Sequence, residues 1–362
     1  MIIIKELEKF IRKLQDDHGY SEIATPIMVK KKLFEQSGHW KFFKENIFGL
    51  KVDKESYALK PMNCPESALV YKHAKRSYRD LPLRLAEIGR LHRNELSGVL
   101  GGLLRVRQIT MDDAHIYCRD NQVKSELISV LKMTQEFYKT LDLPVFYGLA
   151  TRPKKAMGDL KSWKEAEDIL SEALKEVGLP YKILKGEGAF YGPKIHFDIK
   201  DSLERTWTIA TAQLDFQMPE NFKLEYTDEE GKTQRPAVIH RAIFGSFERF
   251  IGIMLEHTQG ALPFWLSPIQ TAVLPISDTT AKYASEMCAQ LKTNGIRAWL
   301  DNRNETIGKK IREAELQKIP YILVVGEREA ASHTVAVRQR SKGDLGQMSL
   351  DKFLDSIKFE TT

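Results

Sequence analysis

The sequence predicts two domains of different fold class: an α+β domain with a mainly antiparallel sheet flanked by helices, then a smaller α/β domain with a mixed sheet. Residues 83–91 and 103–110 alternate apolar and polar side chains around a glycine-containing loop, which is typical of an antiparallel strand pair. Residues 271–357 alternate strand-like and helix-like segments, which favours a small α/β unit. Prolines flanking Phe264 and Trp265 place the boundary between 1–266 and 267–362.

The individual elements follow from hydrophobic spacing and from turn residues. Ile3, Leu7, Phe10, Ile11 and Leu14 recur at helical spacing and predict an amphipathic first helix. A short strand then ends near Pro26. Further helices are predicted at 29–37, 121–141, 162–177, 241–257, 279–293, 307–317 and from 349. Further strands are predicted at 189–201, 205–216, 271–276, 296–300, 321–326 and 334–340.

The composition is that of an ordinary globular protein: 362 residues, of which 42% are hydrophobic and 29% charged. The net charge of +6 is compatible with a polyanionic partner but does not establish one. Three widely spaced cysteines do not form a disulfide framework, so we expect a reducing compartment. No apolar run is long enough for a membrane helix, and the N-terminus does not have the pattern of a signal peptide. A cytoplasmic location is expected, with the mitochondrial matrix as the alternative.

Cys64, His115 and His240 are the most informative residues. Together they form a sulfur and nitrogen ligand set suited to zinc, and three protein ligands leave a fourth position open, as in catalytic zinc sites. Alone, one cysteine and two histidines could equally be core residues. The strings that contain them decide between these interpretations: KPMNCP at 60–65, MDDAHIYC at 111–118 and VIHRAIFGSFERF at 238–250.

These strings resemble those of the class II aminoacyl-tRNA synthetases, and within that class those of the threonyl enzymes. The segment ending at Pro26, the run Arg93-Asn94-Glu95 and the helix with Arg249 resemble the three class motifs. The resemblance covers essentially the whole chain. It implies a class II catalytic domain over 1–266, an anticodon-binding domain over 267–362, a homodimer, and the substrates ATP, L-threonine and tRNA(Thr).

The resemblance implies that Arg93 bridges the substrate carboxylate and the α-phosphate, while Arg105 and Arg249 hold the γ-phosphate end and the adenine. Glu95 would accept from the adenine amino group, Thr208 would lie beside ATP, and Mg²⁺ would share the phosphate charge. Arginine suits this work because its planar fork binds carboxylate and phosphate in pairs of hydrogen bonds. For any single arginine the alternative is a surface salt bridge.

Zinc would select threonine over valine, since an apolar pocket separates these near-isosteres poorly. The resemblance assigns the ligands to Cys64, His115 and His240. Asp113 lies two residues before His115, so on a strand it faces the same side and can accept the substrate hydroxyl proton. The resemblance also places four residues around this pocket: Met111, Tyr191 and Gln213 as substrate-binding residues, and Lys194 as a catalytic residue.

His39 matches the family histidine near the ribose hydroxyl of the tRNA 3′ end. A histidine titrates in the range of a general base, although a packed histidine beside Trp40 is the alternative. In the smaller domain, Asn304, Glu329 and Arg338 match positions that read anticodon bases, which needs amide, carboxylate and guanidinium groups. Exposed charged residues are the alternative there.

Several residues depart from the usual family pattern. Met111 replaces a Gln, Glu66 and Ser67 replace Gly-His, Gly101 replaces a His, and Thr208 and Ala210 replace a Gln and a Gly. The family's N-terminal editing domain is not in this sequence; either it was removed or this branch lacks it. We expect measurable formation of Ser-tRNA in the absence of another correcting enzyme. Two alternatives stay open: an RNA-binding regulatory paralogue, and a ligase for another amino acid.

Overall fold

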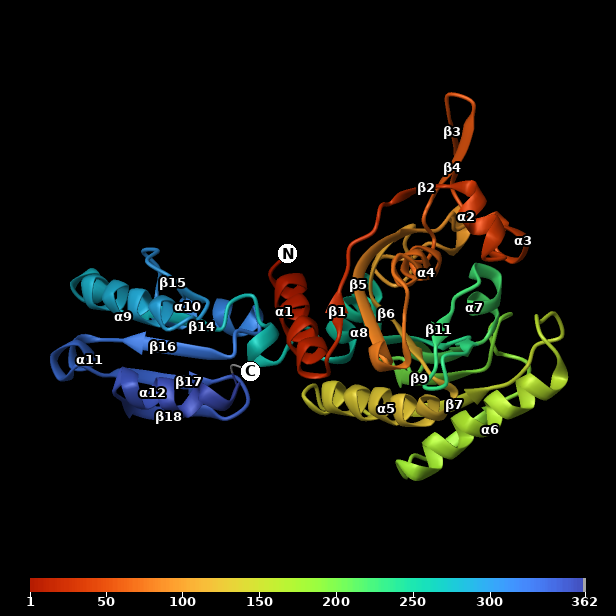
Figure 1. Ribbon diagram of the computed structural model, residues 1–362. Helices are drawn as coiled ribbons and strands as arrows, with labels where there is room; N and C mark the ends of the chain where they lie inside the picture. Colours follow the sequence, from red (N-terminus) through yellow and green to blue (C-terminus); the bar gives the residue numbers. More distant parts are fainter. Residues whose placement is uncertain (361–362) are drawn as a thin grey trace. The chain divides into compact units, whose positions relative to one another are not determined.

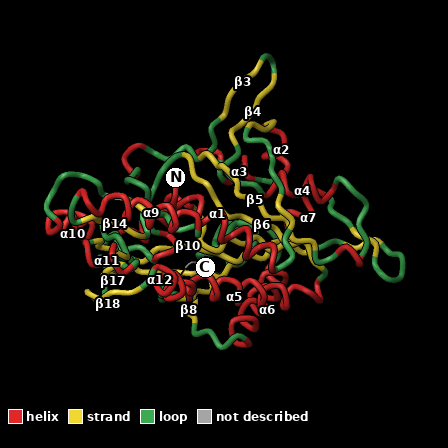
Figure 2. The backbone as a smooth tube through the Cα atoms, turned by 90° about the vertical axis from the view of Figure 1, so that its left-hand side faces the viewer, coloured by secondary structure: helices red, strands yellow, loops and turns green. Residues whose placement is uncertain are grey.

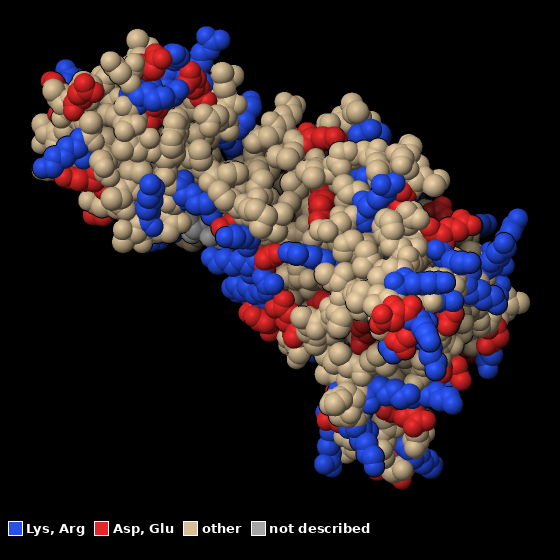
Figure 3. Space-filling view, turned by 90° about the horizontal axis from the view of Figure 1, so that it is seen from above, with Lys and Arg blue, Asp and Glu red and all other residues tan. Residues whose placement is uncertain are grey.

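The computed structural model describes residues 1–360 and contains two compact units. One is Phe10–Ile253, and the other combines Met1–Lys9 with the chain from Met254 onward. The predicted domain boundary between residues 266 and 267 stays a prediction. Within residues 1–360, no helix has both the length and the apolar character needed to cross a membrane. On the face shown in Figure 3, basic and acidic side chains lie interspersed.

An eight-stranded sheet organises the larger unit (Figure 1). Only its two end pairs, β1–β5 and β7–β8, are parallel; the other neighbours are antiparallel. The predicted fold class, a mainly antiparallel sheet flanked by helices, is therefore confirmed. The strands in spatial order are β1 (Ser21–Glu22), β5 (Leu83–His92), β6 (Gln108–Cys118), β13 (Ala237–Ser246), β10 (Thr206–Asp215), β9 (Lys194–Lys200), β7 (Phe146–Ala150) and β8 (Tyr181–Leu184).

Two long helices, α5 (Val123–Lys139) and α6 (Leu160–Glu176), cover one face of this sheet. The ring of Phe137 packs on Phe244 and Phe250 at centroid distances of 5.2 and 5.5 Å, and all three rings are buried. The opposite face carries the candidate site. Other elements of this unit are α4 (Cys64–Lys72), α7 (Gln217–Phe222), β11 (Tyr226–Thr227), β12 (Thr233–Gln234) and the first part of α8 (Phe247–His257).

A three-stranded sheet forms an arm on the larger unit (Figures 1 and 2). Its elements are β2 (Met28–Lys30), β3 (Gly49–Val52) and β4 (Glu55–Leu59), with α2 (Lys31–Gln36) and α3 (His39–Phe42) between β2 and β3. The helix predicted at 29–37 therefore starts too early, because Val29 pairs with Ala58 in the arm. The strand predicted at 103–110 begins only at Gln108, because Gly101 and Arg105 bridge to form a turn.

The smaller unit has the predicted mixed sheet. Three parallel strands, β15 (Ala298–Leu300), β14 (Thr271–Pro275) and β16 (Tyr321–Val325), are followed by two antiparallel ones, β17 (Val335–Gln339) and β18 (Gly343–Met348). The sequence did not predict β18 or α11. The helices are α9 (Ala281–Thr293), α10 (Ile307–Leu316), α11 (Glu327–Ser332) and α12 (Leu350–Ile357). Helix α1 spans Ile2–Asp17, and only its part up to Lys9 belongs to this unit.

Candidate active site

The structure brings the three predicted metal ligands together. Cys64 begins α4, directly before Pro65, and proline is favoured in a first helical turn. His115 on β6 and His240 on β13 are directly paired across the two antiparallel strands. One ligand atom of each of the three residues lies within 4.8 Å of the others, and all three side chains are buried.

The donor atoms of this trio fit a metal ion. His115 Nε2 and His240 Nδ1 are buried and have no hydrogen-bond partner within residues 1–360. His240 Nε2 lies 3.0 Å from Asp215 Oδ2, so this carboxylate accepts the imidazole proton and leaves the lone pair on Nδ1. Without a metal, burial raises the pKa of the Cys64 thiol, and a bound cation would favour the thiolate. Zinc suits this set because it prefers sulfur and nitrogen ligands.

A cavity of about 260 Å³ adjoins the trio, and we name it the Cys-His-His cavity. Asp113 lies in its wall, as predicted, and accepts from Asn63 Nδ2 at 3.0 Å. Tyr191 also lines it and donates to Gln213 Oε1 at 2.6 Å. Its other lining residues are Phe43, Met62, Cys64, Leu91, Arg93, Met111, Ala189, Phe190 and His240.

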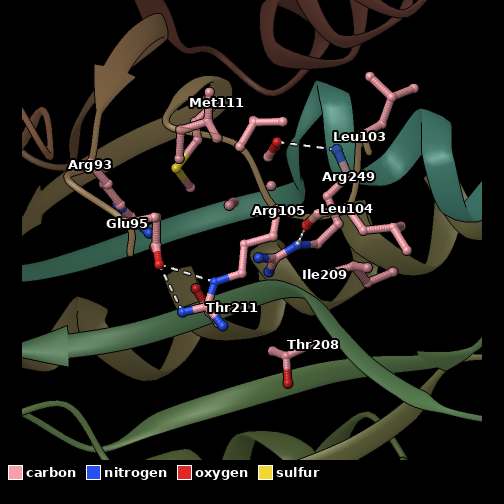
Figure 4. A pocket seen from close by; sticks show the side chains of 15 residues that line it. Arg93, Glu95, Leu103, Leu104, Arg105, Met111, Thr208, Ile209, Thr211 and Arg249 are labelled. Carbon is pink, nitrogen blue, oxygen red and sulfur yellow. Dashed lines mark hydrogen bonds and ion pairs between the residues drawn. The ribbon is translucent and has the colours of Figure 1, made fainter. Parts of the chain in front are cut away.

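A second cavity, of about 140 Å³, contains the predicted ATP residues, and we name it the arginine cavity (Figure 4). Arg105 donates to Glu95 Oε2 through two nitrogens, at 2.8 and 3.0 Å. Arg249 Nε donates to the Leu104 carbonyl at 3.0 Å. Thr208 also lines this cavity, but its hydroxyl donates to Asp198 at 2.6 Å. The predicted ATP residues therefore lie together, with two arginines already hydrogen-bonded.

Arg93 and Met111 line both cavities. Arg93 follows β5, and its Nε donates to the Pro61 carbonyl at 3.3 Å. A guanidinium at this shared wall can contact a group in either cavity. Two anions bound on its two sides would be held next to each other, which is the arrangement that a reaction between them requires.

His39 is buried on α3, and its ring lies edge-on to Phe190 at 5.8 Å. Ser37 Oγ donates to the Phe34 carbonyl, so it must accept from His39 Nδ1, 2.7 Å away. This leaves a lone pair on Nε2, which is buried without a partner in the described chain. Burial lowers the pKa of His39 to about 4, so the expectation that it titrates near neutral pH is wrong: the ring is neutral.

The other predicted residues lie outside the two cavities. Lys194 on β9 pairs with Gln213 on β10, and burial lowers the pKa of its amine. In the smaller unit, Asn304 lies in the loop after β15. Glu329 accepts from the Gly326 amide at 2.9 Å, and Arg338 lies 3.7 Å from Glu315. The last two therefore already have partners within the unit.

Sequence reasoning missed two side chains that hold others in place: Asp215 behind His240, and Asn63 beside Asp113. A signal for Asp215 is present, because it lies two residues from Gln213 on one strand and so shares its face. Glu66, one of the residues that departs from the usual family pattern, is buried. Its carboxylate has no hydrogen-bond partner in residues 1–360, and burial raises its pKa to about 8.

Comparisons with known proteins agree with this geometry. Residues 48–258 match the family model of the tRNA synthetase class II core domain (G, H, P, S and T). Residues 270–360 match that of the anticodon binding domain. The chain is 52% identical over 360 residues to the threonine–tRNA ligase of Carboxydothermus hydrogenoformans and 52% identical to that of Clostridium novyi. These matches cover 99% of this chain and 57% and 56% of the relatives, so the chain spans little more than half of their length.

A solved structure is also similar. The crystal structure of the RNA binding domain of threonyl-tRNA synthetase from Cryptosporidium parvum aligns with a TM-score of 0.95 at 42% identity, covering 99% of this chain and 90% of that one. The chain therefore belongs to the class II tRNA synthetases and, within them, to the threonyl-tRNA synthetase family.

Proposed function

We propose that the protein is a threonine–tRNA ligase, which activates L-threonine with ATP and transfers it to the 3′ end of tRNA(Thr). The single observation that carries this proposal is that Arg93 lines both the Cys-His-His cavity and the arginine cavity. Arg93 stands between a cavity with a metal-binding trio and a cavity with further arginines. An amino acid and a nucleotide bound in these two cavities would meet at its guanidinium.

In the activation step, the threonine carboxylate attacks the α-phosphate of ATP and pyrophosphate leaves. Arg93 binds both reacting groups and reduces their repulsion. Arg105 and Arg249 hold the far end of the nucleotide, and Mg²⁺ carries part of the phosphate charge. Arg105 is half-exposed and paired with Glu95, so its change of partner to a phosphate costs little.

Recognition of threonine uses the Cys-His-His cavity. Cys64, His115 and His240 would hold a zinc ion, which would supply Lewis-acid recognition of the amino and hydroxyl groups of the substrate. Asp113 accepts the hydroxyl proton, and Asn63 fixes the orientation of this carboxylate. Valine has no hydroxyl, so its binding would leave Asp113 buried without that partner.

In the transfer step, the ribose hydroxyl attacks the carbonyl carbon of threonyl-adenylate and AMP leaves, while His39 Nε2 accepts the hydroxyl proton. The anticodon would lie on the smaller unit, at Asn304, Glu329 and Arg338. A homodimer is proposed because Ile27 and Met28, beside the first class motif, are 39% and 47% exposed. The cytoplasm is the proposed location, and the mitochondrial matrix is the alternative.

The test is ATP–pyrophosphate exchange driven by threonine, serine or valine, with and without a chelator. We expect chelator-sensitive exchange with threonine, weaker exchange with serine and almost none with valine. Absence of exchange with every amino acid, from folded and zinc-loaded protein, would favour the regulatory RNA-binding paralogue instead. Exchange with a different amino acid would favour a ligase of altered specificity.

A further inference from the structure

The two consecutive carboxylates on β6 have different surroundings. Asp113 lines the Cys-His-His cavity, whereas Asp112 is fully buried and lines neither cavity. Successive side chains of a strand point to opposite faces, so the two carboxylates serve different sides of the sheet. The function proposed above uses Asp113 and leaves Asp112 without a role.

Asp112 faces an interruption in the pairing of β6 with β13. Ala242 pairs with Asp113 and Ser246 pairs with Met111, so the residues 243–245 of β13 stand opposite Asp112 alone. Such an insertion bends the strand and breaks its regular hydrogen bonds. The backbone amides in this bulge need other acceptors, because buried N–H groups without partners are costly.

The Asp112 carboxylate supplies these acceptors. Its oxygens accept from the amides of Ile243 and Gly245, each at 2.7 Å, and from the amide of Phe244 at 3.3 Å. The carbonyl of Ile243 in turn accepts from the Tyr138 hydroxyl at 2.9 Å. One carboxylate therefore fixes three consecutive amides of the bulge.

The conformation held in this way is a special one. Gly245 has a φ of 70°, and a Cβ there would lie 2.3 Å from the Ile209 carbonyl oxygen. Only glycine fits this position, and Gly245 together with Ala242 and Ser246 lines the arginine cavity. The bulge is therefore part of the wall against which the nucleotide would bind.

The bulge also sets the start of α8. Ser246 Oγ accepts from the Arg249 amide at 3.3 Å and donates to Glu248, which accepts from the Thr110 amide at 2.9 Å. Arg249 lies within the first turn of α8 and reaches into the arginine cavity (Figure 4). Its position therefore depends on the backbone immediately before it.

We propose that Asp112 is a positioning residue for ATP: it holds the bulge at 243–245 and thereby sets the wall of the arginine cavity and the place of Arg249. The inference rests on the proposed function, because it assumes that the arginine cavity binds ATP. Arg241, which lies on β13 just before the bulge, supports Asp112 from the neighbouring strand. Its Nη1 donates to the Asp112 carbonyl at 3.1 Å, and its guanidinium lies over Tyr20 at 4.4 Å.

The test compares Asp112→Asn with the double variant Asp112→Asn/Arg241→Met. An asparagine offers one acceptor oxygen and turns its NH₂ toward backbone amides, so part of the bulge loses its partner. We expect the KM for ATP in threonine-driven exchange to rise about tenfold or more, with zinc content and the KM for threonine within about twofold of the parent.

The double variant separates positioning from stability. Nη1 of the buried Arg241 lies 3.8 Å from the Asp112 carboxylate, so the single variant leaves this charge without its acidic partner, whereas the double variant removes the charge. We expect the double variant to recover thermal stability but to keep the raised KM for ATP. Recovery of both together would mean that Asp112 acts only through the stability of the fold, and would overturn the proposal.

Two further measurements distinguish a loss of ATP positioning from a loss of stability and from a failure of the proposed function. Glu126→Gln removes another buried carboxylate, which pairs with Arg84 through two hydrogen bonds at 2.7 Å, and should lower stability without changing the KM for ATP. Direct titration of Mg²⁺-ATP by calorimetry tests binding when exchange is absent. If the parent binds no ATP, the proposed function fails. If the parent binds ATP and Asp112→Asn binds it equally well, only the present inference fails.

Discussion

The Cys-His-His cavity and the arginine cavity share a wall but differ in how their polar groups are satisfied. In the first, His115 Nε2 and His240 Nδ1 are buried without partners among residues 1–360. In the second, Arg105 is already paired with Glu95, and Arg249 donates to a backbone carbonyl. Leaving a buried nitrogen without a partner costs about 1–3 kcal/mol, whereas an exposed ion pair contributes little and exchanges easily.

This difference indicates two kinds of ligand. Two buried histidine nitrogens without partners, one of them on a ring whose far side is held by the Asp215 carboxylate, are suited to a group that stays bound, such as a metal ion. Arginines that already make hydrogen bonds within the protein are suited to a substrate that enters and leaves at every turnover. We therefore expect damage to the first cavity to abolish activity, and damage to its supporting residues to have graded effects.

The largest effect is expected from Cys64→Ala. Loss of one of three protein ligands should release the zinc and reduce threonine-driven exchange by at least about a thousandfold. Metal analysis and exchange assays on the same preparation would measure both. Cys118→Ala is the matched control, because Cys118 is equally buried in the larger unit but belongs to no ligand cluster in the described chain. Full activity of Cys64→Ala in the absence of zinc would show that the Cys-His-His cavity needs no permanently bound metal. It would contradict the proposed difference between the two cavities.

A smaller effect is expected from Asp215→Asn. This carboxylate accepts from His240 Nε2 at 3.0 Å and so fixes the ring, and loss of such a partner typically weakens metal binding by about ten- to a hundredfold. Competition with a chelating dye would measure the affinity, and excess zinc should restore most of the exchange activity.

Asp201→Asn is the control for Asp215→Asn. Asp201 is also buried, but it accepts from Trp207 Nε1 and from the Leu203 amide in the loop between β9 and β10. Its loss should lower stability and leave zinc affinity unchanged. Equal zinc affinity in the parent and Asp215→Asn would show that metal binding does not depend on the hydrogen bond between Asp215 and His240.

The sequence predicted the metal trio and the arginines because residue type and local strings carry that information. It also placed Asp113 beside His115, since strand periodicity fixes which residues share a face. It could not predict the contact between Asp215 and His240, which depends on the pairing of β10 with β13. Nor could it predict the role of Asp112, because a register shift is a property of two strands together.

Errors in the fold have similar causes. The arm was missed because its strands are short and mostly exposed, so they lack the alternation of a half-buried strand. Helix α4 was missed although Pro65 is a helix-start signal, because the string around Cys64 was interpreted only as a ligand motif. In the smaller unit, the buried strands β14 and β16 were predicted well, whereas the exposed β18 was not.

The smallest effect is expected at His39, whose ring packs edge-on against Phe190, a lining residue of the Cys-His-His cavity. Its pKa of about 4 makes it a weak base, so His39→Gln should slow transfer to tRNA only about tenfold, below the usual hundredfold for a well-matched base. Exchange driven by threonine should stay within about twofold, because activation does not use this residue. Single-turnover transfer and exchange, measured side by side, would separate the two steps.

The lowered pKa of His39 also determines how its contribution to folding stability changes with pH. Because the folded pKa lies below the ordinary value of 6.5, the neutral ring contributes stability above that value, and the contribution is lost as the pH falls toward 4. Between pH 6 and 8 the ring does not change charge, so His39 should add no inflection to the transfer rate. Ser37→Ala keeps the imidazole but removes the acceptor that fixes its tautomer, and should slow transfer less than His39→Gln does. An inflection near pH 6.5 in the parent that disappears in His39→Gln would show that the ring titrates normally, and that this edge of the cavity is more open to water than its burial indicates.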